Sequence, residues 1–253
     1  MPISVALYVV HLHQESYCHS TIVSHLSAIS YVHKCYNFPE PNKHFLVQRS
    51  LLGIRNSSCL QDPRLPITLP LLHKLCSALD HTCSSPRSRT LFQSMFLLAF
   101  HAFLRVGEMT LSHSCHQNIL QLDQIHFQPT QASMLVVFRH FKHSNGRTHT
   151  ILVKSGSPPF CPVVSLQSYL KYRGDSPGPL FTVSTGQPIT RQQFVQALNR
   201  GLHFLGLSSI LYKTHSFRIG AASYGVHQGL TDAQIRHLGR WKSDAFRSYI
   251  RLS

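Results

Sequence analysis

The sequence predicts a mainly helical protein with a small antiparallel β-sheet, an α+β fold, in two domains. Apolar residues recur at helical spacing over residues 1–58 and again after Pro162, whereas apolar and polar residues alternate in the middle of the chain. The pair Asn145-Gly146 marks a tight turn between two alternating segments. A polar stretch with two prolines, residues 57–66, separates a first domain at 1–58 from a second at 67–253.

The first domain is predicted to be helical from the spacing of its apolar side chains, between which lie basic residues and histidines. These apolar positions are Leu7, Val10, Ile22, Leu26, Ile29 and Val32. In the second domain, residues 69–79 have a helical pattern, and residues 90–104 have a stronger one. In the stronger helix the apolar stripe is so wide that nearly every side chain is expected to be buried.

Three segments in the middle of the chain are predicted to be strands, namely residues 120–127, 134–141 and 148–153. Asn145-Gly146 accepts positive φ at both residues, so it is expected to join the last two strands in a hairpin. Lys142 would lie at the tip of that hairpin.

Helices are predicted again at residues 163–172, 191–205, 216–228 and 231–238, and from residue 243 to the end. Thr231 and Gln234 have the spacing of a capping box. Ser243 followed by Asp244 supplies another helix start.

The charge of the chain indicates a polyanionic partner. Twenty-four Lys and Arg residues stand against nine Asp and Glu residues, which gives a formal net charge of +15 with histidines neutral. Such an excess attracts nucleic acid over a long range, and we expect double-stranded DNA as the partner. The alternative is that the charge serves only solubility. No apolar run approaches the roughly 20 residues of a membrane span, so no membrane segment is expected.

The cysteines and histidines give no sign of a disulfide or metal site. The seven cysteines are odd in number and contain no Cys-x-x-Cys pair, so we expect reduced thiols in an intracellular protein. His113, Cys115 and His116 lie close together, but no second ligand pair follows at zinc-site spacing. Phosphate-binding loops and dinucleotide motifs are absent from the sequence, so neither a nucleotide nor another cofactor is expected.

One series of residues has a specific order. His215 and Arg218 have the spacing His-x-x-Arg, and Gly239-Arg240-Trp241 and then Tyr249 follow them. The spacing alone means little in a chain with 19 histidines, and His237 with Arg240 forms a second such pair. Taken in order, however, these motifs resemble the tyrosine recombinase (phage integrase) family. The amino-acid sequence of these motifs is most similar to that of recombinases of eukaryotic DIRS- or Crypton-type mobile elements. The resemblance covers nearly the whole chain.

The resemblance implies a set of site residues. The family's first catalytic arginine corresponds to Arg105, and the acidic residue that supports it corresponds to Glu108. The hairpin lysine, the His-x-x-Arg pair, the penultimate His or Trp position and the nucleophile correspond to Lys142, His215, Arg218, Trp241 and Tyr249. Trp241 and Tyr249 are eight residues apart, one fewer than is common in the family.

The chemistry of phosphodiester cleavage independently requires these types of residue. Attack on phosphorus adds negative charge to the non-bridging oxygens, which the guanidiniums of Arg105 and Arg218 can bind in bidentate fashion. A tyrosine hydroxyl has a pKa of about 10 in solution, so His215 is expected to act as a base or positioning group. Expelling an unprotonated 5′ oxygen costs more than forming the tyrosine phenolate, so the leaving oxygen needs an acid. Lys142 is the candidate for that acid, and the alternative is that Lys142 only contacts the phosphate. Trp241 either donates its indole N–H to the phosphate or packs in the core.

The expected function is therefore site-specific DNA recombination or integration through a 3′-phosphotyrosyl intermediate at Tyr249. The resemblance implies that residues 1–58 form a core-binding domain shorter than usual and that residues 67–253 form the catalytic domain. It also implies a homo-oligomer on DNA, from dimer to tetramer, in the nucleus. The chain ends four residues beyond Tyr249, before the helix that many relatives exchange between subunits.

Two alternatives stay open. One is a catalytically inactive DNA-binding protein derived from a mobile-element recombinase, and the other is a relaxing topoisomerase that uses the same chemistry.

Overall fold

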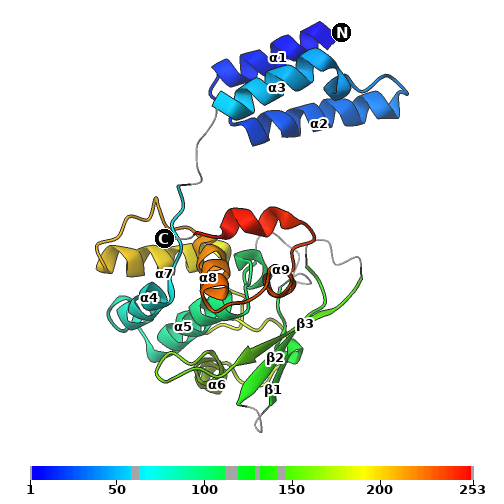
Figure 1. Ribbon diagram of the computed structural model, residues 1–253. Helices are drawn as coiled ribbons and strands as arrows, with labels where there is room; N and C mark the ends of the chain where they lie inside the picture. The colour runs from blue at the N-terminus through cyan, green and yellow to red at the C-terminus, as the bar shows by residue number, and fades with distance from the viewer. Residues whose placement is uncertain (1, 58–62, 112–118, 129–131, 142–145, 252–253) are drawn as a thin grey trace. The chain divides into compact units, whose positions relative to one another are not determined.

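The computed structural model divides the chain into two compact units, Met1–Pro63 and Arg64–Ser253, and each is described by itself (Figure 1). The described residues are 2–57, 63–111, 119–128, 132–141 and 146–251. Lys142, Asn145 and the group His113, Cys115 and His116 lie outside the described residues. Among the described helices, none has both the length and the apolar character that crossing a membrane requires.

The first unit is helical. It contains α1 (Pro2–Gln14), α2 (His19–Cys35), the 3-10 helix η1 (Pro41–Lys43) and α3 (Phe45–Ser57). Its core consists of Val5, Val9, Leu12, Ile22, Leu26, Val47 and Ile54. Of the apolar positions in the predicted pattern, Ile22 and Leu26 are buried, whereas Leu7, Val10 and Val32 are exposed. Helix α1 is apolar around much of its circumference, so its sequence period does not show which face packs.

The helices of the second unit follow the predicted order. They are α4 (Leu69–Thr82), α5 (Pro86–His101), α6 (Pro162–Arg173), α7 (Arg191–Phe204), α8 (Ser216–His227) and α9 (Asp232–Gly239). Helix α9 begins at the capping box that the sequence predicts. The Gln234 N–H donates to Thr231 Oγ1, and the Thr231 N–H donates to Gln234 Oε1.

The prediction of a helix from Ser243 to the end is only partly right. Ser243 does start a helical segment, because its side chain accepts from the Ala245 N–H. The segment is the six-residue 3-10 helix η6 (Asp244–Tyr249), and the chain is extended from Ile250. So short a segment gains little from helix propagation, and the buried side chain of Phe246 anchors it instead.

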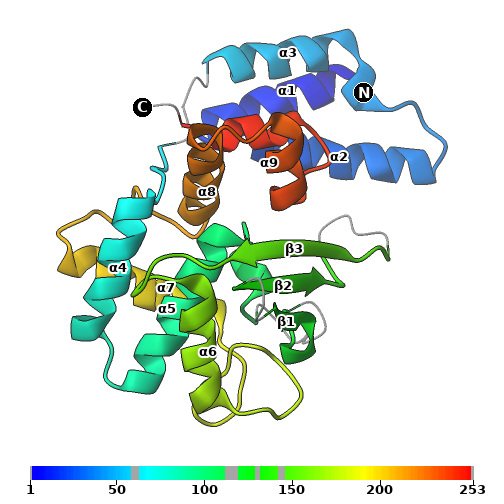
Figure 2. The ribbon, with the colours of Figure 1, turned by 60° about the horizontal axis from the view of Figure 1, so that its bottom comes forward.

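The described residues of the middle region form a three-stranded antiparallel sheet in the order β1-β2-β3. The strands are β1 (Ile125–Gln128), β2 (Ser133–Phe138) and β3 (His149–Lys154), and the 3-10 helix η4 (Leu122–Gln124) replaces the first part of the first predicted strand. In β3, Ile151 and Val153 are buried while Leu152 is exposed, as the alternation predicts. Figure 2 shows α9 lying next to β3 and beside α8.

Helix α5 passes through the core of the second unit and contacts α4, α6 and α8. Its residues from Met95 to Phe100 are all buried, in keeping with the wide apolar stripe. The chain leaves α5 through Phe103, whose φ of 50° lies in the left-handed region. This conformation costs a non-glycine residue about 1–2 kcal/mol, and it turns the chain toward the site described next.

Candidate active site

Six of the seven predicted site residues lie in the described part of the second unit, on three separate segments. Arg105 and Glu108 follow α5, His215 and Arg218 lie at the start of α8, and Trp241 and Tyr249 follow α9. The ring centroids of His215 and Tyr249 are 6.1 Å apart, and those of Trp241 and Tyr249 are 5.3 Å apart. The fold therefore brings residues from distant parts of the sequence to one place. Lys142, the seventh residue, lies outside the described residues.

Arg105 and Glu108 form an ion pair directly after α5. The backbone N–H of Arg105 donates to Glu108 Oε2 at 2.8 Å, which caps the 3-10 helix η2 (Val106–Glu108). The guanidinium donates from Nη1 to Glu108 Oε1 at 3.0 Å. The carboxylate thus holds both the backbone and the side chain of Arg105. Because that side chain is still 24% exposed, an anion can reach it from solvent.

Arg218, in the first turn of α8, is almost completely buried. It donates from Nη1 to the Phe103 carbonyl and from Nη2 to the Gly239 carbonyl, the latter at 2.9 Å. The Trp241 ring covers its guanidinium, with 4.2 Å between Cζ and the ring centroid. Burial lowers the pKa of Arg218 to about 9, and neighbouring arginines add to this, so the group stays charged at pH 7.

The position of Trp241 depends on Gly239. A Cβ atom at residue 239 would lie 1.6 Å from Cζ3 of the indole, so only glycine leaves room for the ring. The ring also meets Phe103 edge to face, with 6.2 Å between centroids. The observed role of Trp241 is therefore to cover Arg218, and donation to a phosphate stays a prediction.

Arg240 is a further arginine of the site, and sequence reasoning missed it. Its side chain is fully buried and donates from Nη2 to Glu108 Oε2 at 2.6 Å. Its Cζ atom lies 3.9 Å from the centroid of Phe138 in β2. The sequence contains Arg240 in the Gly239-Arg240-Trp241 motif and in the chance spacing with His237, and neither gave the residue a role. An arginine at the end of a helix ordinarily binds the last carbonyls near solvent.

His215 directly precedes α8 and is partly buried. Burial lowers its pKa to about 4, and the positive charges of four nearby arginines, led by Arg64 and Arg218, act in the same direction. The imidazole is therefore neutral at pH 7, with one ring nitrogen able to accept a proton. Its ring stands edge to face with that of Tyr249.

Tyr249 ends η6 beside the arginines. The centroid of its ring lies 5.8 Å from Cζ of Arg218. Buried Phe246 and two exposed ion pairs hold η6 against α9. The ion pairs are Arg247–Asp232 at 3.0 Å and Arg236–Asp244 at 3.7 Å. The short spacing between Trp241 and Tyr249 thus still places the tyrosine in the site of its own chain.

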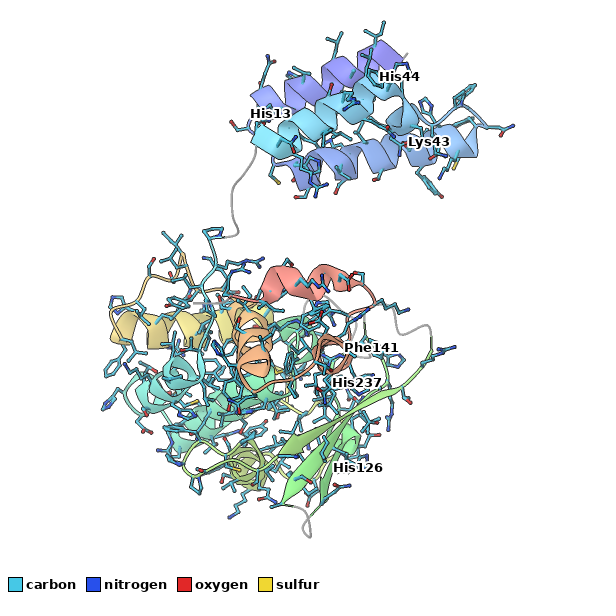
Figure 3. The ribbon with its side chains drawn as sticks, viewed as in Figure 1. His13, Lys43, His44, His126, Phe141 and His237 are labelled. Carbon is cyan, nitrogen blue, oxygen red and sulfur yellow. The ribbon has the colours of Figure 1, made fainter. Side chains whose placement is uncertain are left out.

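A cleft of about 650 Å³ opens beside the site, between β3 and α9. Its lining includes the cationic or titratable residues Arg147, His149, Arg236, His237 and Lys242. Phe141 and His237 line it from the hairpin and from α9 (Figure 3). The described residues that line it include no carboxylate, so the charge of the cleft suits an anionic ligand with several phosphate groups.

The histidines and cysteines of the described segments form neither a metal site nor a disulfide. No group of three or more potential metal ligands occurs among the described residues. The described cysteines Cys18, Cys35, Cys76, Cys83 and Cys161 are free thiols.

Neither a protein-family profile nor a curated protein matches the chain, but solved structures do. The Tn1549 transposon integrase in complex with circular intermediate DNA matches with a TM-score of 0.66 and 12% identity, over 100% of this chain and 81% of that chain. A lambda integrase dimer bound to a COC′ core site matches with a TM-score of 0.63 and 15% identity, over 99% and 64%. The XerH site-specific recombinase bound to palindromic difH substrate matches with a TM-score of 0.54 and 14% identity, over 76% and 49%.

At these identities the matches show the fold. The chain spans about half the length of the XerH chain. The structural neighbours are tyrosine recombinases and integrases, and the predicted fold class is confirmed. The finer resemblance to DIRS- or Crypton-type recombinases stays a prediction.

Proposed function

We propose that this protein is a site-specific DNA recombinase or integrase that cleaves and rejoins DNA through a 3′-phosphotyrosyl intermediate. The observation that carries the proposal is that His215 and Arg218 lie beside Tyr249 within one unit, with Arg105 close enough for its charge to help lower the pKa of His215. The recombinase fold and the net charge of +15 support it. So does the cationic cleft beside Trp241.

The reaction begins when Oη of Tyr249 attacks a DNA phosphorus. The neutral imidazole of His215 takes the phenol proton as the new O–P bond forms. The bond between phosphorus and the 5′ oxygen breaks, and that oxygen takes a proton from Lys142. Later a 5′-hydroxyl attacks the phosphotyrosine and releases Tyr249. The covalent bond conserves the phosphodiester energy, so the reaction needs no ATP or other cofactor.

Arg105 and Arg218 stabilise the charge that develops on the non-bridging oxygens. Arg105 is reachable from solvent, and the buried Nε–H of Arg218 has no acceptor among the described residues. An unpaired buried donor is destabilising, so a phosphate oxygen is a fitting partner for it. Trp241 covers this guanidinium, and we propose that its ring moves aside as the phosphate enters.

The remaining parts of the proposal concern the assembly. Residues 1–58 act as a core-binding domain, and residues 67–253 act as the catalytic domain on duplex DNA. The protein works as a homo-oligomer, from dimer to tetramer, in the nucleus, and derives from a DIRS- or Crypton-type mobile element. The lambda integrase match, which is a dimer on DNA, supports the oligomer, but only by analogy of fold.

A nicked suicide substrate that loses its 5′-hydroxyl fragment tests the nucleophile. The unmodified chain should form a protein–DNA adduct that survives denaturant. Tyr249→Phe should abolish the adduct and leave the Kd for DNA within about threefold, or ~0.7 kcal/mol. Tyr224→Phe is the matched control, because Tyr224 is a partly buried tyrosine of α8 whose hydroxyl the proposal does not use.

Other outcomes of this experiment would support one of the two alternative functions or a different nucleophile. Binding without any adduct would identify an inactive DNA-binding protein. Relaxation of supercoiled DNA without pairing of two sites would identify a topoisomerase. An adduct lost in Tyr224→Phe and kept in Tyr249→Phe would move the nucleophile to Tyr224.

A substrate with sulfur in place of the bridging 5′ oxygen tests Lys142. A thiolate leaves without an acid, since a thiol has a pKa of about 8.5. Lys142→Ala should slow cleavage of normal DNA by about 10²- to 10⁴-fold and cleave the sulfur substrate at nearly the unmodified rate. Equal slowing on both substrates would transfer the acid role elsewhere, with Lys154 the first residue to test.

A further inference from the structure

Arg240 lies inside a polar cluster and exposes no side-chain surface. Its Nη2 atom donates to Glu108 Oε2 at 2.6 Å and to the Phe103 carbonyl at 3.2 Å. Its Nη1 atom lies 3.4 Å from the Ala102 carbonyl and 3.3 Å from the Leu238 carbonyl. Protein acceptors therefore engage both terminal nitrogens. The Nε–H has no acceptor among the described residues, but the side chain exposes no surface at which DNA could contact it.

The two acceptors of Nη2 are shared with the phosphate-binding arginines. Glu108 accepts from Arg240 through Oε2 and from Arg105 through Oε1. The Phe103 carbonyl accepts from both Arg240 and Arg218. Arg240 is thus connected to each of these arginines through a single intervening acceptor.

The surroundings keep Arg240 charged and in place. Phe138 of β2 lies against its guanidinium at 3.9 Å. Burial lowers the pKa of Arg240, but the Glu108 carboxylate opposes this effect, and a guanidinium stays protonated at neutral pH. Its planar fork reaches two acceptors at once, which the single ammonium of a lysine cannot do in the same geometry.

We propose that Arg240 is a positioning residue that sets the orientation of Arg105 and Arg218 without contacting DNA. The inference rests on the proposed function, because it assigns these two arginines to the phosphate. Without Arg240, the Glu108 carboxylate keeps, among the described residues, only the backbone N–H and the guanidinium of Arg105 as partners. Its orientation is then less firmly fixed, and so is that of the Arg105 guanidinium. Misplaced donors stabilise a transition state poorly even when they still bind the ground state.

Adduct formation at saturating nicked DNA is the first test. Arg240→Met should lower the rate about 100-fold and Arg240→Lys about tenfold, with little change in the Kd for DNA. Arg89→Met is the matched control. Arg89 also pairs with a carboxylate at 2.6 Å, that of Asp80, but its side chain is 46% exposed. This variant loses the same charge and should keep its rate within about twofold.

A double variant tests the route of the effect. If Arg240 acts through Glu108 on Arg105, then Arg105→Lys combined with Arg240→Met should be no slower than the slower single variant. A general loss of packing would instead multiply the two effects. Multiplied effects would overturn the inference, as would a folded Arg240→Met protein that forms adduct at the unmodified rate.

A measurement on the free protein separates this inference from the proposed function. The order parameter of the Arg105 Nε–H bond, from ¹⁵N relaxation, should fall from roughly 0.8 to below roughly 0.6 in Arg240→Lys. This variant keeps a positive charge beside Glu108, so it tests the inference even if Arg240→Met does not fold. An ordered Arg105 in Arg240→Lys overturns the inference, whether or not adduct forms. Loss of order in Arg105 without any adduct from the unmodified chain supports the positioning role and rejects the recombinase function.

Discussion

Two ion pairs near the Tyr249 segment have similar lengths and very different surroundings. Arg240 meets Glu108 at 2.6 Å, with side-chain exposures of 0% and 9%. Arg247 meets Asp232 at 3.0 Å, with exposures of 66% and 51%. Water and salt screen the exposed pair, whereas a buried charge that loses its partner has no water to replace it. Burial, rather than distance, therefore decides how much each pair contributes, and the following expected effects run from largest to smallest.

Glu108→Gln should have the largest effect, because it leaves Arg240 buried without a counter-charge. The free energy of unfolding should fall by about 3–5 kcal/mol, measured by urea denaturation. Adding Arg240→Met to this variant should recover much of the loss, since an apolar side chain of similar length needs no partner. A loss under about 1 kcal/mol would show that water reaches the buried pair.

Gly239→Ala should have the next effect, because its Cβ atom would overlap the Trp241 ring. The displaced ring should lower stability by about 1–3 kcal/mol and uncover Arg218. Trp241 is the single tryptophan of the chain, so its fluorescence reports the ring directly. Emission should move to longer wavelength, and an unchanged spectrum would contradict the covering role.

Acidification should destabilise the second unit through His215. The pKa of His215 is lowered to about 4 in the folded protein, against about 6.5 in an unfolded chain. The unfolded state therefore binds more protons between these values, and stability is lost as pH falls from about 6.5 toward 4. His101, which is partly buried, contributes in the same direction, because burial lowers its pKa to about 4 as well.

His215→Gln should reduce this dependence of unfolding free energy on pH without removing it. His126→Gln, at an exposed position of β1, is the control and should leave the dependence unchanged. Equal slopes in the His215 variant and the unmodified chain would contradict the assignment.

Asp232→Asn should have the smallest effect, since it removes an exposed ion pair. We expect a loss of about 0.5 kcal/mol at 0.1 M salt, and a smaller difference at 1 M. A loss as large as that of Glu108→Gln would mean that exposure does not separate the two pairs.

Local signals were enough to predict much of the fold. The capping box at Thr231, the alternation in β3 and the apolar stripe of α5 each depend on neighbours within a few residues. The buried face of α1 was not predictable, because apolar residues surround much of that helix. The 3-10 geometry of η6 was also missed, since the packing of Phe246 and not a local pattern holds that segment.

The candidate site shows the same limit. The resemblance named His215, Arg218 and Tyr249, but only the fold shows that the rings of His215 and Tyr249 and the guanidinium of Arg218 lie side by side. Arg240 was missed because its burial depends on Glu108, which lies 132 residues away in the chain. A single arginine after a helix carries no local sign of such a partner.

The Phe103 carbonyl accepts from both Arg218 and Arg240, and its residue has a left-handed φ of 50°. For a protein engineer, residue 103 therefore affects the site through its backbone carbonyl rather than through its side chain. A substitution that relaxes this turn changes the direction of that carbonyl oxygen and so changes the positions of both guanidiniums together. The two arginines cannot be optimised one at a time, and a library that varies either of them has to vary position 103 as well.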